Sequence, residues 1–284
     1  MNSTAIPRAG VAGWPISHSR SPLIHGYWLR TLGIAGSYER FAVPPDGFAA
    51  FAQTIRDGAL VGANVTVPHK ESAFAACDRV TANAVGLGAV NTLWREDGKL
   101  CGDNTDVTGF LANLDERAPG WSSEVRSAVV IGAGGAARAI VAGLRSRGVE
   151  SITLVNRTLD RAARLAEQFG GAVEAAAFEA LTVQLANADL LVNTSSLGMQ
   201  GQPELAIDLT PLPPQAIVAD IVYVPLRTQL IEAAAARGLR VVDGLGMLLH
   251  QAVPGFERWF GVRPVVTAQL RALIEADIPA ARKG

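Results

Sequence analysis

The chain has 284 residues, of which 49% are hydrophobic and 18% are charged, and its formal net charge at pH 7 is −1. This apolar fraction is typical of a globular protein and excludes an extended disordered chain. The near-zero net charge argues against a nucleic-acid partner, because binding a polyanion requires a broad basic surface. Since the length is nearly twice that of a typical domain, we expect two domains.

The cysteines indicate whether the protein works in a reducing or an oxidising compartment, and the length of its apolar runs indicates whether it spans a membrane. Cys77 and Cys101 are the only cysteines and do not form a CxxC pair. They predict neither a disulfide scaffold nor a structural zinc site, and they favour the reducing cytoplasm. Residues 1–19 lack the apolar core of a signal peptide. No run approaches the about 20 apolar residues of a membrane helix, so we expect no membrane partner.

The first region of the chain alternates short apolar runs with longer Ala- and Leu-rich stretches. This alternation predicts an α/β protein with mostly parallel sheets. Ser21 precedes Pro22 and has the position of a helix N-cap. Asp97-Gly98 predicts a β-hairpin between its flanking strands. The expected strands are 10–13, 38–43, 61–67, 90–95 and 99–102, and the expected helices are 22–32, 46–56 and 69–77.

The second region, from about Asp106, continues this alternation up to Gly244. The later residues predict only helices, and periodicity alone leaves open whether these cover the second sheet or return to the first region. The expected strands are 127–131, 151–155, 189–192, 216–221 and 240–242. The expected helices are 135–147, 159–169, 228–237, 247–259 and 266–276.

A glycine-rich loop, Gly132-Ala133-Gly134-Gly135-Ala136-Ala137, joins the strand at 127–131 to the helix that follows it. Glycine lets the backbone approach a pyrophosphate closely, and the helix N-terminus offers free N–H groups to the anion. Because the loop lies between a strand and a helix, it predicts a Rossmann-type dinucleotide site.

The next strand ends where such sites bind the ribose. An NAD site usually has Asp or Glu here, whereas this chain has Asn156-Arg157-Thr158 and then Arg161. Two guanidinium groups one helical turn apart can bind a 2′-phosphate, which predicts NADP as the cofactor. The alternative is a solvated helix face in which both arginines pair with Asp160.

Three polar clusters interrupt the apolar background of the first region. Ser17–Pro22 contains hydroxyls at a helix entry, which could bind a carboxylate or could simply cap the helix. Asn64 and Thr66 share one face of a strand, and two buried polar side chains there are costly unless that face lines a binding site. Lys70 begins a helix, where the positive end of the helix dipole is unfavourable for a cation, and this also indicates a functional site. The third cluster is Asn91-Thr92 with 102–106.

Asp106 in the third cluster is a candidate carboxylate partner for Lys70. A metal site from Asp103 and Asp106 lacks a supporting His or Glu and is not expected. The four histidines have no zinc-binding spacing, and no Gly-x-Ser-x-Gly motif predicts a serine hydrolase.

These motifs, in this order, closely resemble the shikimate dehydrogenase family over nearly the whole chain. The matching segments are 13–22, 62–70, 88–92, 104–106, 132–136, 156–158, 193–199, 243–248 and 251–252. The resemblance implies NADPH-dependent reduction of 3-dehydroshikimate to shikimate, a step of aromatic amino-acid biosynthesis. It also implies a substrate domain formed by 1–105 and 244–284, with an NADP-binding domain formed by 106–243 inserted into it and a cleft between the two.

The resemblance also implies residue roles. Lys70 and Asp106 resemble the catalytic pair, with Lys70 as the proton donor. Substrate binding is implied for Ser19, Ser21, Asn64, Thr66, Asn91, Tyr223 and Gln251. Cofactor binding is implied for Gly132, Ala133, Gly134, Gly135, Ala136, Asn156, Arg157, Thr158, Arg161, Thr194, Gly244 and Met247.

The chain departs from the family pattern at Val107, where glycine is frequent, and at His69, where an aromatic residue is common. Neither change removes a polar group from the proposed site. Two alternatives remain: a quinate/shikimate dehydrogenase that uses NAD, and a non-catalytic ligand sensor. The arginines speak against the first, and the presence of both Lys70 and Asp106 speaks against the second. We expect a monomer or a homodimer.

Overall fold

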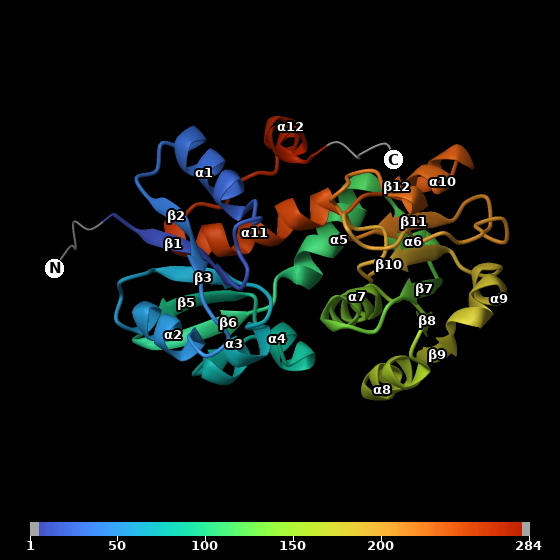
Figure 1. Cartoon of the computed structure of the whole chain (residues 1–284), viewed down its shortest axis with the longest axis horizontal. Coiled ribbons are helices and arrows are strands. Elements are labelled where there is room, and N and C mark those ends of the chain that lie inside the picture. Colours follow the sequence, from blue (N-terminus) through green and yellow to red (C-terminus); the bar gives the residue numbers. More distant parts are fainter. Residues whose placement is uncertain (1–5, 280–284) are drawn as a thin grey trace. The chain divides into compact units, whose positions relative to one another are not determined.

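The computed structural model describes residues 6–279, and the chain divides into two compact units. Unit 1 comprises the residues up to Asp106 together with Leu249–Ile274. Unit 2 comprises Val107–Leu248 and the residues from Glu275 onward. Each unit is built around its own six-stranded sheet (Figure 1).

The sheet of unit 1 has the strand order β2-β1-β3-β5-β6-β4. β1, β2 and β3 are parallel, whereas β5 runs antiparallel to both β3 and β6. The strands are β1 (Arg8–Gly13), β2 (Ser37–Ala42), β3 (Gly62–Val65), β4 (Arg79–Val80), β5 (Thr92–Glu96) and β6 (Lys99–Asp103). The expected hairpin is present, with Asp97 and Gly98 at positive φ between β5 and β6, as a two-residue hairpin turn requires.

Helices cover both faces of this sheet (Figure 1). They are α1 (Ser21–Thr31), α2 (Phe48–Arg56), α3 (Lys70–Ala76), α4 (Ala82–Leu87) and α11 (Leu245–Phe260), with α12 (Ala268–Asp277) after them. Phe51 and Ile55 of α2 pack on one face, and Trp259 of α11 packs on the other. The N-cap of α1 is Arg20, so the prediction that Ser21 caps this helix is wrong. Ser21 is the first helical residue, and its N–H donates to Ser19 Oγ.

The sheet of unit 2 is parallel throughout, with the order β12-β11-β10-β7-β8-β9. Numbered within the unit, this is the 3-2-1-4-5-6 order of a Rossmann-type fold, whose order reverses between β7 and β10. The strands are β7 (Ser127–Ile131), β8 (Ser151–Asn156), β9 (Val173–Ala177), β10 (Leu190–Asn193), β11 (Ile217–Asp220) and β12 (Arg240–Val242).

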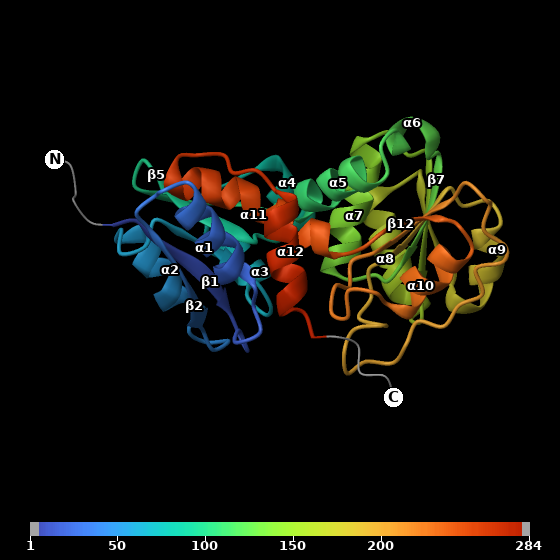
Figure 2. The same cartoon turned by 90° about the horizontal axis from the view of Figure 1, so that it is seen from above.

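The helices of unit 2 lie on both sides of its sheet, with α5, α7 and α8 on one side and α9 and α10 on the other (Figure 2). Leu181, Leu185 and Leu230 pack on the second side, in a core formed with β7, β10 and β11. These helices are α5 (Asp106–Arg117), α6 (Trp121–Glu124), α7 (Gly135–Ser146), α8 (Leu159–Phe169), α9 (Leu181–Leu185) and α10 (Gln229–Ala236), with the 3-10 helix η1 (Phe178–Ala180) before α9. No helix among residues 6–279 is long and apolar enough to cross a membrane.

Candidate active site

Lys70 and Asp106 form the ion pair that the sequence suggested. Lys70 begins α3, and its Nζ lies 2.5 Å from Asp106 Oδ2. Asn91 Nδ2 donates to the other carboxylate oxygen of Asp106 at 2.9 Å. The side chains of Lys70 and Asp106 are 31% and 16% exposed, so the pair is partly shielded but can still be reached by a ligand. The Lys70 ammonium group therefore lies beside a carboxylate whose two oxygens each accept a hydrogen bond.

A short loop between β6 and α5 fixes the backbone of Asp106. Asn104 Oδ1 accepts from the backbone N–H of Asp106 at 3.1 Å. Asn104 Nδ2 in turn donates to the carbonyl of Ala89, and the N–H of Asn104 donates to Asp103 Oδ1. Because Asn104 is buried and held by these bonds, the start of α5 is fixed in one place. The bond from the N–H of Asp106 to the side chain two residues earlier is an Asx-type turn, which the residue type of Asn104 favours.

Asn91 connects this loop to Asp106. Its Oδ1 accepts from the backbone N–H and the hydroxyl of Thr105 and from the hydroxyl of Thr92. One hydrogen of Asn91 Nδ2 is bonded to Asp106, and the other has no partner among the described residues. Asn91 therefore has one N–H left for a ligand.

Asn64 differs from Asn91, although both were predicted to bind substrate. It is buried in β3, and its Nδ2 donates to the carbonyl of Asn91 and to Thr92 Oγ1. Its Oδ1 accepts from the hydroxyl of Tyr38 at 2.6 Å. Because both amide hydrogens are already bonded within the protein, Asn64 is better placed to support the site than to donate to a ligand.

The remaining predicted residues of unit 1 lie at three places. Ser19 precedes α1, and its carbonyl accepts from the guanidinium of Arg40 at 2.6 and 3.0 Å. Thr66 directly follows β3 and is half-buried, and its carbonyl accepts from the N–H of His69. Gln251 lies in α11 and is half-buried. His69 is buried, and its Nε2 is 2.7 Å from the carbonyl of Val43, so this departure from the family pattern has a structural partner.

In unit 2 the glycine-rich loop follows β7 at the point where the strand order reverses. Gly132 has φ of +116°, and a Cβ there would lie 2.5 Å from Thr194 Oγ1, so only glycine fits beside Thr194. Gly134 and Gly135 are exposed, and a Cβ added to either would have nothing within 4 Å. Ala133 and Ala136 flank them, half-buried. The first N–H groups of α7 therefore border open space, as a phosphate site requires.

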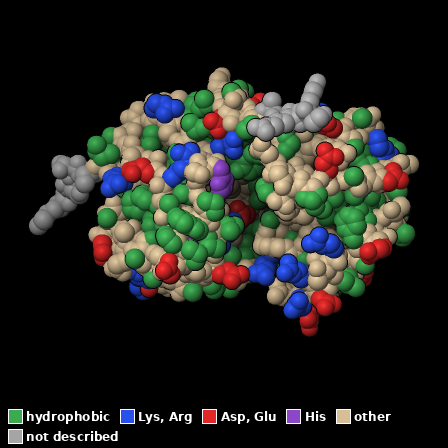
Figure 3. Space-filling view, viewed as in Figure 1, with side chains coloured by type: hydrophobic (Ala, Val, Ile, Leu, Met, Phe, Trp, Pro, Cys, Tyr) green, Lys and Arg blue, Asp and Glu red, His purple; other side chains and the backbone are tan. Residues whose placement is uncertain are grey.

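Arg157 and Arg161 follow β8, and both are exposed. Asn156 Nδ2 donates to the carbonyl of Thr158, the N-cap residue of α8, which fixes the turn between the strand and the helix. Neither guanidinium has a partner within residues 6–279, and Asp160 pairs with neither of them. Lys and Arg side chains gather over α7 and α8 on the face shown in Figure 3. The free guanidinium groups favour the phosphate-binding interpretation over the solvated-face alternative.

Asp220 anchors the loops after β10 and β11. Its carboxylate accepts from Asn193 Nδ2, the N–H of Val222 and the hydroxyl of Thr228. Burial raises the pKa of Asp220 to about 6, although these hydrogen bonds act in the opposite direction. Tyr223 lies in the anchored loop and is half-buried. Of the other predicted cofactor residues, Gly244 packs against the backbone at Ile221, and Met247 lies half-buried in α11.

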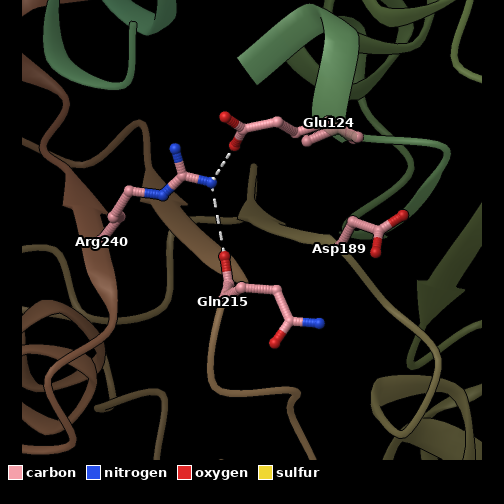
Figure 4. A pocket seen from close by; sticks show the side chains of 5 residues that line it. Glu124, Asp189, Gln215 and Arg240 are labelled. Carbon is pink, nitrogen blue, oxygen red and sulfur yellow. Dashed lines mark hydrogen bonds and ion pairs between the residues drawn. The ribbon is translucent and has the colours of Figure 1, made fainter. Parts of the chain in front are cut away.

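A pocket of about 420 Å³ lies at the opposite edge of the same sheet, next to the amino ends of its strands (Figure 4). Arg240 in this pocket pairs with Glu124 at 2.5 Å and also contacts the carbonyl of Gln215. Asp189 accepts from the N–H groups of Arg126 and Ser127. Because these charged groups are bonded within the protein, the pocket is a weaker candidate than the glycine-rich edge. Among the described residues, no group of three or more His, Cys, Asp and Glu side chains could hold a metal ion.

The strand order and glycine-rich loop of unit 2 are those of a dinucleotide-binding fold, and unit 1 carries the Lys70–Asp106 pair, so the class of protein is a two-unit dinucleotide-binding protein. Three family models match the chain: the shikimate dehydrogenase substrate binding domain over residues 11–93, shikimate/quinate 5-dehydrogenase over 115–200, and the shikimate 5′-dehydrogenase C-terminal domain over 244–273. The chain belongs to the shikimate dehydrogenase family.

Individual relatives extend this match to nearly the full length. The chain is 59% identical to the shikimate dehydrogenase (NADP(+)) of Methylocella silvestris, over 98% of this chain and 99% of the relative. A structure of shikimate 5-dehydrogenase from Thermus thermophilus with NADP(H) and shikimate is 35% identical, with a TM-score of 0.82 over 95% of this chain and 98% of the other. Quinate dehydrogenase from Corynebacterium glutamicum in complex with NAD is 30% identical, with a TM-score of 0.88 over 95% and 99% of the two chains.

Proposed function

We propose that Lys70 and Asp106 carry out the acid–base step of the reaction that this chain catalyses, the NADP-dependent interconversion of 3-dehydroshikimate and shikimate. The observation that carries the proposal is the 2.5 Å contact between Lys70 Nζ and Asp106 Oδ2, with Asn91 bonded to the second carboxylate oxygen. An ammonium group held in this way can give a proton to a substrate oxygen and take it back in the reverse direction.

NADPH, when bound, would provide the hydride for reduction of the carbonyl carbon of the substrate. Lys70 donates a proton from Nζ to the carbonyl oxygen as negative charge develops there. Asp106 orients the ammonium group through Oδ2 and accepts from a substrate hydroxyl. Asn91 donates its remaining N–H to the substrate. In the oxidative direction Lys70 recovers the same proton.

The substrate contacts proposed for the rest of the site follow the family resemblance. Ser19 and Ser21 would hold the substrate carboxylate. Thr66, Asn91, Asp106 and Gln251 would bond the ring hydroxyls, with Tyr223 near the substrate. We propose that residues 1–105 with 244–284 form the substrate domain and that 106–243 form the NADP domain. The ion pair in unit 1 and the glycine-rich loop in unit 2 support the assignment of the bulk of each domain, whereas the compact units count residues 244–248 and 275–279 with unit 2.

The residues of unit 2 fit NADP. The exposed Gly134 and Gly135 lie at the N-terminus of α7, and Arg157 and Arg161 have free guanidinium groups at the end of β8. The pyrophosphate would bind the first amides of α7, and the 2′-phosphate would bind the two arginines. Thr194, Gly244 and Met247 complete the proposed cofactor set, of which Met247 would lie near the nicotinamide.

Replacement of Lys70 tests the acid–base role directly. We expect Lys70→Ala to lower kcat for shikimate oxidation by ~100-fold or more, with a modest change in KM, because a general acid/base is lost. Lys99→Ala is the matched control, since Lys99 is an exposed lysine of the β5–β6 hairpin. The readout is NADPH absorbance in steady-state assays. An unchanged kcat for Lys70→Ala would show that Lys70 is not the proton donor.

The alternative quinate/shikimate activity has one observation in its favour, the likeness to the quinate dehydrogenase that binds NAD. A four-way assay of shikimate or quinate with NADP or NAD separates the two. We expect the highest kcat/KM for shikimate with NADP. A higher kcat/KM for quinate with NAD would favour the alternative, and no turnover of any pair would favour the ligand sensor.

We propose that the protein acts in the cytoplasm as a monomer or a homodimer. Cys77 and Cys101 are free thiols, which fits a reducing compartment. Light scattering of the purified chain measures its oligomeric state.

A further inference from the structure

A continuous series of hydrogen bonds leads from Tyr38 to Asp106 through the interior of unit 1. Tyr38 donates to Asn64 at 2.6 Å, and Asn64 donates to Thr92 Oγ1 at 3.1 Å. Thr92 donates to Asn91 Oδ1 at 2.9 Å, and Asn91 donates to Asp106 at 2.9 Å. The four residues before Asp106 are all buried. In each of these bonds, the residue farther from Asp106 in the series is the donor and the residue nearer to Asp106 is the acceptor.

Three groups that can only donate, or only accept, fix the donor-to-acceptor direction of these hydrogen bonds. The backbone N–H of Thr105 can only donate, so the side-chain oxygen of Asn91 must face it. The backbone carbonyl of Asn91 can only accept, so the side-chain nitrogen of Asn64 must face it. The Asp106 carboxylate accepts from both Lys70 and Asn91. Both amide orientations therefore follow from their surroundings.

Thr92 is the hydroxyl that joins the two amides. β5 places Thr92 opposite Asn64 of β3 on one side and opposite Asp103 of β6 on the other. Thr92 Oγ1 accepts from Asn64 Nδ2 and donates to Asn91 Oδ1, and it also lies 3.3 Å from Thr105 Oγ1, whose own hydrogen is given to Asn91 Oδ1. The residue is 1% exposed, so water cannot take over either bond.

We propose that Thr92 is a positioning residue for the reaction: the backbone N–H of Thr105 sets which way the Asn91 amide faces, and the Thr92 hydroxyl, as a further donor to Asn91 Oδ1, holds that amide in place so that its nitrogen keeps the Asp106 carboxylate aligned with Lys70. This inference rests on the proposed acid–base roles of Lys70 and Asp106. Thr92 touches neither of them and acts through Asn91. A buried amide that loses one of its bonds can shift, and small displacements of catalytic groups lower rates strongly.

Two substitutions separate the hydroxyl from the shape of the side chain. Thr92→Val keeps the shape and replaces the hydroxyl by a methyl group, whereas Thr92→Ser keeps the hydroxyl. We expect Thr92→Val to lower kcat about tenfold, with KM for shikimate and NADP within about twofold of the parent, since about one hydrogen bond is lost. We expect Thr92→Ser to stay within about twofold of the parent in kcat.

A double-mutant cycle with Lys70→Ala tests whether Thr92 acts through the ion pair. If it does, adding Thr92→Val to Lys70→Ala lowers the remaining rate by less than about twofold, because the two effects are not additive. A further tenfold loss in that background would overturn the inference and assign Thr92 a general structural role. An unchanged kcat for Thr92→Val alone would also overturn it. Failure of the proposed function itself is recognised separately, by full activity of the single Lys70→Ala variant.

Thermal unfolding of each variant shows whether it is folded at the assay temperature, so that its kcat can be compared with that of the folded parent. If Thr92→Val does not fold, Thr92→Ala removes the same hydroxyl without adding a methyl group beside Asn64, and the same cycle applies. A parent-like kcat for a folded Thr92→Ala would contradict the inference.

Discussion

Arg157 and Arg161 contrast with other arginines of unit 2. Arg147 pairs with Asp115, and Arg240 pairs with Glu124, whereas the guanidinium groups of Arg157 and Arg161 bind nothing among the described residues. An exposed arginine with a structural role usually forms an ion pair with a neighbouring carboxylate, although such exposed pairs contribute little to the stability of the fold. Arg157 follows β8, the strand that pairs with β7 before the glycine-rich loop, so two unpaired cations here favour the proposed anionic ligand.

We expect Arg157→Ala to raise KM for NADP by about tenfold or more and to leave KM for NAD nearly unchanged, because only NADP carries the 2′-phosphate. Arg164→Ala is the matched control, since Arg164 is an exposed arginine of α8, the helix that follows Arg157, and its Nε donates to the carbonyl of Asp160. Steady-state kinetics give KM for NADP and KM for NAD in both the parent and the variant. Equal losses with NADP and NAD would mean that Arg157 supports the fold rather than the phosphate.

At the scale of elements, α11 packs against α5 through a glycine. A Cβ at Gly246 of α11 would overlap Asn113 Oδ1 of α5. Asn113 cannot move away freely, because it is buried and its Nδ2 donates to the carbonyl of Asp243 at 2.7 Å. The approach of the two helices therefore depends on the missing side chain at Gly246.

Gly246→Ala should lower the free energy of unfolding by roughly 1–3 kcal/mol, as overpacked buried sites do. Gly86→Ala is the control: Gly86 lies in α4, and a Cβ there meets nothing within 4 Å. We expect Gly86→Ala to be neutral or to stabilise the protein by about 0.5–1 kcal/mol, since alanine favours the helix. Urea unfolding measures both. Equal stability of the two variants would contradict the packing argument.

At the scale of the whole molecule, two buried titratable groups have opposite effects on acid stability. His25 of unit 1 stacks on Tyr38 with ring centroids 3.9 Å apart, and neither ring nitrogen has a hydrogen-bond partner among residues 6–279. Burial lowers the pKa of His25 from 6.5 to about 3. Between these pH values the unfolded chain binds a proton that the folded chain does not, so stability falls as the pH falls. Asp220 of unit 2, with its pKa raised from 3.8 to about 6, gains a proton first in the folded state and stabilises it over that range.

His25→Phe should remove the loss of stability that His25 causes in acid. Each pH unit below 6.5 costs the parent up to about 1.4 kcal/mol at this residue, so the advantage of the variant should grow from pH 7 to pH 5. Urea unfolding at both pH values measures the difference. His18→Phe is the control, because His18 is exposed. If the parent and His25→Phe lose equal stability between pH 7 and pH 5, His25 takes up its proton within the folded protein.

The sequence predicted most of the long elements, although α5 (Asp106–Arg117) was missed, and it predicted the chemical groups better than the residues that support them. The glycine-rich loop and the hairpin rest on local signals, whereas the Lys70–Asp106 pair rests mainly on the family resemblance, and the structure contains each of them. β9 and α9 were missed because they are short and have little hydrophobic periodicity. The Ser21 cap was wrong because α1 starts one residue earlier than its proline suggests. Thr92 gained a role only when strand pairing placed it opposite Asn64, and Tyr38 only when the fold brought its hydroxyl to the Asn64 side chain across β1, since residues far apart in the sequence reveal no such contact.

The β5–β6 hairpin has a practical consequence for work with this protein. Its strands pair Thr92 with Asp103 at one end and Glu96 with Lys99 at the other, where Asp97 and Gly98 form the turn. About four residues of strand, or about 13 Å at ~3.3 Å per residue, therefore separate the turn from the candidate active site. A fluorescent dye or a surface tether attached at this turn would be fixed to the same strands as Thr92 and would still lie away from the proposed acid–base pair, Lys70 and Asp106.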